Sequence, residues 1–178
     1  YNPSLSSPDK TIPVENGSSY LGSNSLAIDK NDSPCISYCD YTEQLIKYAK
    51  RVDDIWQIEI VDIGPKSMIS RYGGLTSLIL EQQTDKPFIT YFSGNNSIKL
   101  ATKVGNEWKK QIIGTYVAQE EYRVDCSLSS SFTNDSKILC AYSYSITYLE
   151  PHEGGIYLLA EKGALPRKNS VSNWNLYE

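Results

Sequence analysis

The sequence predicts an all-β fold: a β-propeller of three four-stranded blades, which is half or part of a ring. Three observations predict it. A pattern of about 50 residues occurs three times, each copy holds four short strand-like runs, and several runs carry apolar residues on both faces. A sheet with two apolar faces must be covered on both sides, and the blades of a propeller cover one another in this way.

The repeat is clearest between 25–61 and 77–113, and a looser third copy starts at Ser127. The aligned positions are Tyr20, Tyr72 and Tyr122; Ser25, Ser77 and Ser127; Leu26, Leu78 and Leu128; Pro34 and Pro87; Tyr38, Tyr91 and Tyr142; Lys47 and Lys99; Ala49, Ala101 and Ala160; and Trp56, Trp108 and Trp174. We therefore expect blade 1 at 20–71, blade 2 at 72–121 and blade 3 at 122–178. Two insertions, near 145–155 and 162–172, lengthen the third copy.

In the first copy, turn residues separate expected strands at 25–29, 35–39, 45–50 and 56–61. The last two runs could pass for one helix, but Val104-Gly105-Asn106 interrupts the second copy at this point, which favours strands. Residues 1–19 form an N-terminal arm, in which 11–14 could be the outer strand of a preceding unit. The alternative is a loose terminal arm.

The first copy reads Ser25-Leu26-Ala27-Ile28-Asp29, Ile36-Ser37-Tyr38, Lys47-Tyr48-Ala49 and Trp56. These motifs resemble the blades of secreted bacterial and archaeal β-propeller repeat proteins. The resemblance covers residues 20–178 and is weakest in the third copy, which lacks the Pro and Lys positions. It implies a propeller fold and an extracellular or secreted location, but no activity, because that family has no single one.

Composition excludes two classes of partner. With 17 basic and 21 acidic residues the net charge is −4, which argues against nucleic acid. No run approaches the roughly 18 apolar residues of a membrane span. Sequons at Asn16, Asn31, Asn95 and Asn134 fit a secreted glycoprotein.

Four cysteines are present, without a CxxC motif, so a zinc site is not expected. Cys35 and Cys39 stand four apart on one expected strand, about 13 Å at strand rise, too far for a disulfide. Cys126 and Cys140 lie on strands expected to pair, so a bridge between them is conceivable.

The loops that join strands 2 and 3 of each blade, together with those between blades, share one face, which in propellers is usually the binding face. Its candidate ligand-binding residues are Asp40, Tyr41 and Glu43 in blade 1 and Tyr148, Glu150, His152 and Glu153 in the first insertion of blade 3. The alternative is that the insertion is a tolerated surface loop, because the opposite face also grew near Pro166.

Other patterns favour structural explanations. The single His152 beside two glutamates falls short of a metal-ligand set, and there is no G-x-S-x-G motif for a serine nucleophile. Asp53-Asp54 and Glu120-Glu121 are expected in solvated turns rather than as a glycosidase pair. Asp29-x-Asn31-x-Ser33 fits turn chemistry better than calcium binding. The repeated Trp and Tyr favour packing between blades over sugar stacking.

We therefore expect a non-enzymatic binding module, without cofactor, catalytic residues or metal, that recognises a glycan or a protein. Alternatives are a structural subunit of an extracellular or envelope polymer and a glycan-active enzyme. Three blades leave two apolar faces exposed, so a lone monomer is not expected. Further blades would come from a second copy or a longer chain, and the strand-like arm favours the longer chain.

Overall fold

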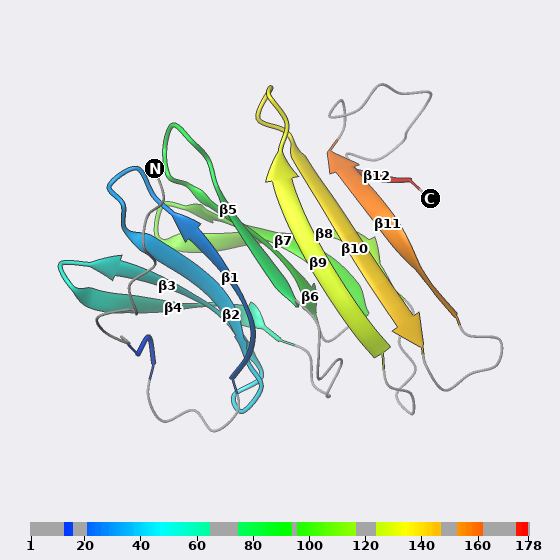
Figure 1. Cartoon of the computed structure of the whole chain (residues 1–178), viewed down its shortest axis with the longest axis horizontal. Helices are drawn as coiled ribbons and strands as arrows, with labels where there is room; N and C mark the ends of the chain where they lie inside the picture. The colour runs from blue at the N-terminus through cyan, green and yellow to red at the C-terminus, as the bar shows by residue number, and fades with distance from the viewer. Residues whose placement is uncertain are drawn as a thin grey trace, which may run out of the picture.

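The computed structural model describes residues 13–15, 21–64, 75–93, 96–116, 124–146, 153–161 and 174–177. These residues form three antiparallel sheets, each built from four strands consecutive in the sequence (Figure 1). The predicted all-β fold with three four-stranded blades is confirmed. No helix in this part of the chain is long and apolar enough to cross a membrane.

Each blade is a meander whose first strand is the innermost. Blade 1 contains β1 (Leu21–Ile28), β2 (Pro34–Asp40), β3 (Leu45–Val52) and β4 (Ile55–Ile63). Blade 2 contains β5 (Thr76–Leu80), β6 (Pro87–Ser93), β7 (Ser97–Val104) and β8 (Glu107–Thr115). Blade 3 contains β9 (Val124–Phe132), β10 (Ile138–Ile146), β11 (Glu153–Glu161) and β12 (Trp174–Tyr177). β1 packs beside β5, and β5 beside β9, so the inner strands are the contact line between blades.

Short turns connect the strands because their residues tolerate the left-handed backbone. Asp53 and Asp54 have φ values of 48° and 66°, as a two-residue hairpin loop of type I′ requires. The same hairpin in blade 2 uses Gly105, with φ of 62°. The adjacent carboxylates of Asp53 and Asp54 are therefore turn residues, as the sequence predicted.

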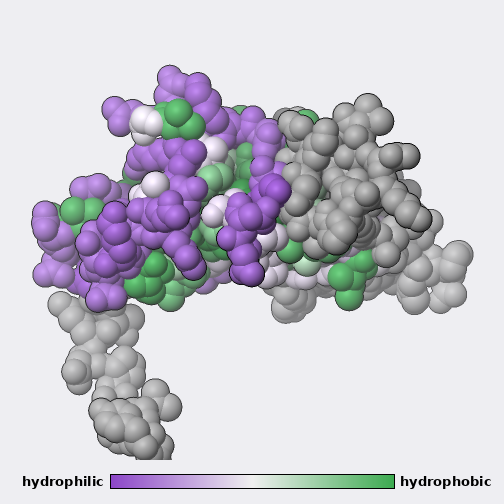
Figure 2. All heavy atoms as spheres, turned by 90° about the horizontal axis from the view of Figure 1, so that it is seen from above, coloured by the Kyte–Doolittle hydropathy of each residue, from purple (hydrophilic) through white to green (hydrophobic). Residues whose placement is uncertain are grey.

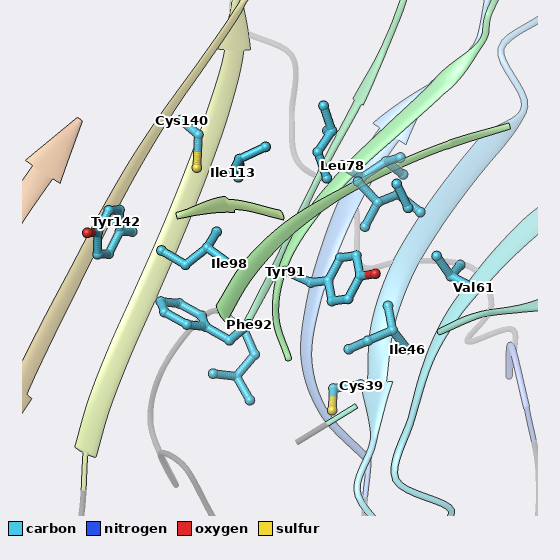
Figure 3. Packing of buried hydrophobic residues seen from close by; sticks show 14 of the residues in the cluster. Cys39, Ile46, Val61, Leu78, Tyr91, Phe92, Ile98, Ile113, Cys140 and Tyr142 are labelled. Carbon is cyan, nitrogen blue, oxygen red and sulfur yellow. The ribbon is translucent and has the colours of Figure 1, made fainter. Parts of the chain in front are cut away.

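The hydrophobic core lies between the blades. Tyr91 on β6 points toward Ile46 and Val61 of blade 1 (Figure 3). Its neighbour Phe92 points the opposite way and makes an edge-to-face contact with Tyr142 of blade 3, with ring centroids 6.3 Å apart. Alternation along one strand therefore serves two interfaces, which explains why apolar residues occupy both faces of a run.

The register corrects the alignment of the third copy. The backbone N–H of Leu78 donates to Ser25 Oγ of the preceding blade, and that of Ser130 donates to Ser77 Oγ. Ser129, not the predicted Ser127, is therefore the counterpart of Ser25. By the same pairing Leu159, not Ala160, takes the place of Ala49 and Ala101. The error arose because the Ser-Leu pattern occurs in β9 only at Ser127-Leu128, two residues before the true counterpart.

The bridge between Cys126 and Cys140, which the sequence left open, does not form. Cys126 lies opposite Tyr144 and Cys140 opposite Ser130, so the two cysteines are four positions apart in the pairing of β9 and β10. That offset corresponds to about 13 Å, beyond the reach of a disulfide. All four cysteines, including Cys35 and Cys39, are buried and form no disulfide among the described residues.

Candidate functional site

A cleft opens beside the innermost strand of blade 1, on the side away from blade 2. Its volume is ≈ 580 Å³, in the range of small-molecule sites. Residues of three kinds line it: apolar, hydroxyl- or amide-bearing, and acidic. They are Val14, Leu21, Gly22, Leu26 and Ile36; Ser23, Asn24 and Tyr38; and Glu15. None of Asp40, Tyr41 and Glu43, the residues predicted for a binding face in blade 1, is among the lining residues.

Beside the cleft, four charged residues form a cluster that we call the Lys47 cluster: Glu15, Asp40, Glu43 and Lys47. The ammonium of Lys47 lies 2.9 Å from Glu15, 2.9 Å from Asp40 and 2.6 Å from Glu43. The Lys47 side chain is only 5% exposed. Burial lowers the pKa of Lys47, but the three carboxylates together outweigh it and raise that pKa well above its usual range. Lys47 is therefore a permanent cation at neutral pH.

The Lys47 cluster also explains why three acids lie together. Ligand oxygens of Glu15, Asp40 and Glu43 lie within 4.8 Å of one another, a spacing that a metal ion could bridge. The Lys47 ammonium already contacts all three, so it supplies the positive charge that such a grouping needs. The acids are therefore explained by an internal ion-pair network.

Tyr38 connects the cluster to the cleft. Its hydroxyl donates a 2.7 Å hydrogen bond to Glu15, while its ring forms part of the cleft lining. Burial, followed by the bond to Glu15, raises the pKa of Tyr38, so the phenol stays protonated at neutral pH. A neutral hydroxyl and a carboxylate therefore face the same space.

Blade 2 contains the closed counterpart of this arrangement. Asp62 at the end of β4 accepts hydrogen bonds from Tyr91, 2.7 Å away, and Lys99, 2.9 Å away. Tyr91 and Lys99 correspond to Tyr38 and Lys47, and Glu15 thus occupies the place of Asp62. This supports the interpretation of the N-terminal arm as standing where a preceding outer strand would be, although Pro13–Glu15 itself has no strand pairing. Residues 11 and 12 lie outside the described residues.

The structure places the predicted site residues in different settings. Asp40 is fully buried and caps the β2–β3 turn, accepting from the backbone N–H groups of Thr42 and Glu43. Tyr41 is half-buried against β1, where its ring fills the space that a side chain at Gly22 would need. Glu43 is exposed beside Lys47.

The predicted residues of blade 3 are described only in part. Tyr148, Glu150 and His152 lie outside the described residues, and Glu153 is placed only as the first residue of β11. Sequence reasoning missed Glu15 and Asn24, because one is on the arm and the other on an inner strand. The sequence held one signal for Glu15: a Tyr and a Lys recur in the first two copies, and such a pair needs an acidic partner from the preceding unit.

Other predicted patterns have structural roles. Asp29 accepts from the backbone N–H groups of Asn31 and Ser33 and pairs with Lys50 at 2.9 Å, so it closes a turn as the sequence predicted. Trp108 packs edge-on against Tyr48 of blade 1, with centroids 5.4 Å apart, and its Nε1 donates to Glu59. The repeated Trp at this junction is thus a contact between blades.

The fold and its inter-blade contacts define the chain as part of a β-propeller. No family model matches the sequence, and no curated protein matches it. Among solved structures, a mutant of the Aleuria aurantia lectin AAL in complex with Fucα1-6GlcNAc has a TM-score of 0.54 at 9% identity, covering 88% of this chain and 47% of the lectin. A triple mutant of AofleA from Arthrobotrys oligospora has a TM-score of 0.53 at 12% identity, covering 89% and 42%.

The chain therefore spans less than half the length of these two proteins. A more distant match, with a TM-score of 0.41 at 8% identity, is the α-L-arabinofuranosidase Arb93A from Fusarium graminearum, covering 92% of this chain and 62% of the enzyme. At these identities the likeness shows the fold alone: an all-β chain of partial β-propeller architecture.

Proposed function

We propose that this chain is a non-enzymatic glycan-binding module that holds a sugar in the cleft beside β1. The observation that carries the proposal is the mixed lining of the cleft. Leu26 and Ile36 offer an apolar surface, whereas Asn24 and Glu15 offer hydrogen-bonding groups. Sugars present apolar C–H faces and hydroxyl edges, and a site for them needs both kinds of wall.

The comparisons support a glycan over other small ligands. One of the similar propellers is a lectin in complex with Fucα1-6GlcNAc. Fucosylated glycans are therefore the first ligands to test. A volume of ≈ 580 Å³ suits one or two sugar rings.

Catalysis by the described acids is the weaker alternative. A glycosidase needs one carboxyl group to donate or accept a proton while the other acts on the sugar. Asp40 is fully buried and shares Lys47 with Glu15 and Glu43. Asp40 therefore lacks access to substrate, and Glu15 is already paired with Lys47 and Tyr38, so binding without turnover is favoured.

Glycan-array screening of the full chain, followed by calorimetric titration of the best ligand, tests the proposal. Asn24→Ala removes a polar group from the cleft and Glu15→Gln removes its carboxylate charge, and each should weaken binding by roughly 10-fold. Asn106→Ala, an exposed asparagine in the β7–β8 turn, is the matched control and should leave affinity unchanged. Binding that is insensitive to both cleft variants would place the sugar elsewhere, and no binding to any glycan would reject the function.

An extracellular location belongs to the same proposal. Two sequon asparagines, Asn31 and Asn134, are exposed in the turns between the first two strands of blades 1 and 3. Both are accessible to a glycosylating enzyme. Recovery of the protein from the cell interior of its source, and not from the medium or envelope, would contradict this location.

A structural subunit is the second candidate. One observation favours it. The kind of blade face that is buried between neighbouring blades is uncovered on blade 1 and on blade 3, at the two ends of the stack. Hydrophobic atoms reach the surface in several places among hydrophilic ones (Figure 2). Such surfaces mark contact sites between molecules.

A further inference from the structure

Blade 1 ends the stack with an apolar face, which we call the blade 1 edge face: Leu26, Ile28 and Ile58. These side chains point away from blade 2 and are exposed. Leu26 is 61% exposed, whereas Leu78, at the same position in blade 2, is 4% exposed because blade 1 covers it. A position that is buried inside the stack is therefore open at this end.

Blade 3 ends the stack on the other side with the blade 3 edge face: Ser129, Ala141, Ile156 and Leu158. Ser129, Ala141 and Leu158 are cross-strand neighbours in one row. The corresponding row of blade 2 is Ser77, Thr90 and Leu100, and it is buried under blade 3. On the blade 3 edge face Ser129 and Ile156 are exposed, and the four residues carry no charge.

The two junctions within the chain show how such faces fit. At each one a serine of the inner strand accepts a hydrogen bond from a backbone N–H of the next inner strand: Ser25 from Leu78 at 3.0 Å, and Ser77 from Ser130 at 2.9 Å. Ser129 is the third serine in this series. The backbone N–H of Leu26 is the donor at the corresponding position of blade 1.

Charge also matches the two edge faces. At the junction of blades 1 and 2, Asp62 of the covering blade pairs with Lys99. On blade 1, Glu15 from the chain's own arm already pairs with the equivalent Lys47. A blade that covers blade 1 therefore need not bring an acid to this position, and none of Ser129, Ala141, Ile156 and Leu158 is acidic.

A further pair of donors is left open on blade 1. Arg51 Nε and Trp56 Nε1 are buried and make no hydrogen bond within the described residues. Their counterparts in blade 2, Lys103 and Trp108, both bond Glu59 of the preceding outer strand. The register position of Glu59 in blade 3 is that of Tyr177 on β12. Chain from a covering blade is thus expected beside these donors.

We propose that the blade 1 edge face is covered by the blade 3 edge face of a second copy of this chain. Two such junctions, related by a two-fold axis, join two sets of three blades into a closed ring of six, within the four to eight blades typical of propellers. The covering blade would bury Leu26 and Ile36, as Leu78 and Ile89 are buried in blade 2, so a sugar and the second copy compete for this wall of the cleft. The assembly follows from packing and does not depend on glycan binding.

Light scattering coupled to size exclusion tests the assembly on the full chain. A mass of two chains is expected, where one chain is 20.0 kDa. Leu26→Asp on the blade 1 edge face and Ser129→Arg on the blade 3 edge face should each weaken the dimer by roughly 100-fold, because every dimer contains the altered face twice. Both side chains are exposed in one chain, so circular dichroism should show unchanged strand content. Val104→Asp, at an exposed apolar residue of the β7–β8 hairpin, is the control.

Mixing the two variants identifies which faces meet. In a dimer of Leu26→Asp with Ser129→Arg, one junction is unaltered and the other pairs Asp with Arg, so the mixture should recover the dimer that neither variant forms alone. Three outcomes would overturn the proposal: a monomer at every concentration tested, a dimer that resists both variants, and a mixture that stays monomeric.

Discussion

The carboxylate of Asp62, near the end of the outer strand of blade 1, accepts a 2.7 Å hydrogen bond from the hydroxyl of Tyr91 in blade 2. The two residues are 29 positions apart, and the bond joins two separate sheets. The same geometry recurs one blade earlier, where Glu15 accepts from Tyr38. The same hydrogen bond between an acidic residue and a tyrosine therefore helps to hold each unit on the next.

Removing the buried ammonium of the Lys47 cluster should destabilise the fold. Lys47→Met leaves the buried carboxylate of Asp40 without its cation, and the free energy of unfolding should fall by about 3 kcal/mol. Lys99→Met is the matched control: its side chain is 23% exposed, and Asp62 keeps Lys110 as a partner, so about 1 kcal/mol is expected. Urea unfolding measures both, and equal losses would contradict the special role of Lys47.

Acid should weaken the β1–β2 turn. The hydrogen bond from Lys50 lowers the pKa of Asp29 below 3.8, against an opposing effect of burial. A depressed pKa contributes stability that is fully present above the unfolded value of 3.8 and is lost as pH falls through the lower folded value. In Asp29→Asn this part of the acid sensitivity should disappear. Unfolding curves at pH 7 and near pH 3 that shift equally in both proteins would refute this.

Gly114 and Leu159 should be energetically coupled. A Cβ at Gly114 would lie 2.9 Å from Leu159 Cδ1 of blade 3. Gly114→Ala is expected to cost about 1 kcal/mol through overpacking. In a Leu159→Ala background the added methyl has room, so the same change should cost less or become stabilising. Strict additivity of the two changes would show that these residues do not meet.

All four thiols should be free and unreactive in the folded protein. Burial raises the pKa of Cys39 to about 12, and burial also raises the pKa values of Cys35 and Cys140. Ellman's reagent should therefore react slowly with native protein and count four thiols after denaturation without reductant. A count of two would mean that a disulfide has formed.

The fold could be predicted because the copies of the repeat can be compared with one another. Val104-Gly105-Asn106 in the second copy excluded a helix that the first copy alone allowed, and the observed β3–β4 and β7–β8 hairpins confirm that choice. The register of the third copy was predicted wrongly because Ser127 is followed by Leu128, as in the other copies, whereas the true counterpart Ser129 is followed by Ser130.

The residues that line the cleft could not be predicted from the sequence. They come from the arm, β1 and β2, whereas Asp40, predicted as a ligand-binding residue, accepts from the β2–β3 turn and pairs with Lys47. Glu15 stands 32 residues from Lys47, and its contact depends on how the arm crosses the blade. A contact between segments so far apart in the chain has no regular spacing in the sequence, so the sequence alone does not predict it.

A double-mutant cycle on Asp62→Asn and Tyr91→Phe tests most directly the central claim, that consecutive units stack face to face through contacts from an outer strand to the next blade. A coupling energy of about 1 kcal/mol or more is expected, because Tyr91→Phe removes the donor and Asp62→Asn removes the charge that strengthens this hydrogen bond. A coupling energy of zero, with both single variants folded, would show that the two blades are not stacked in this way and would contradict the account.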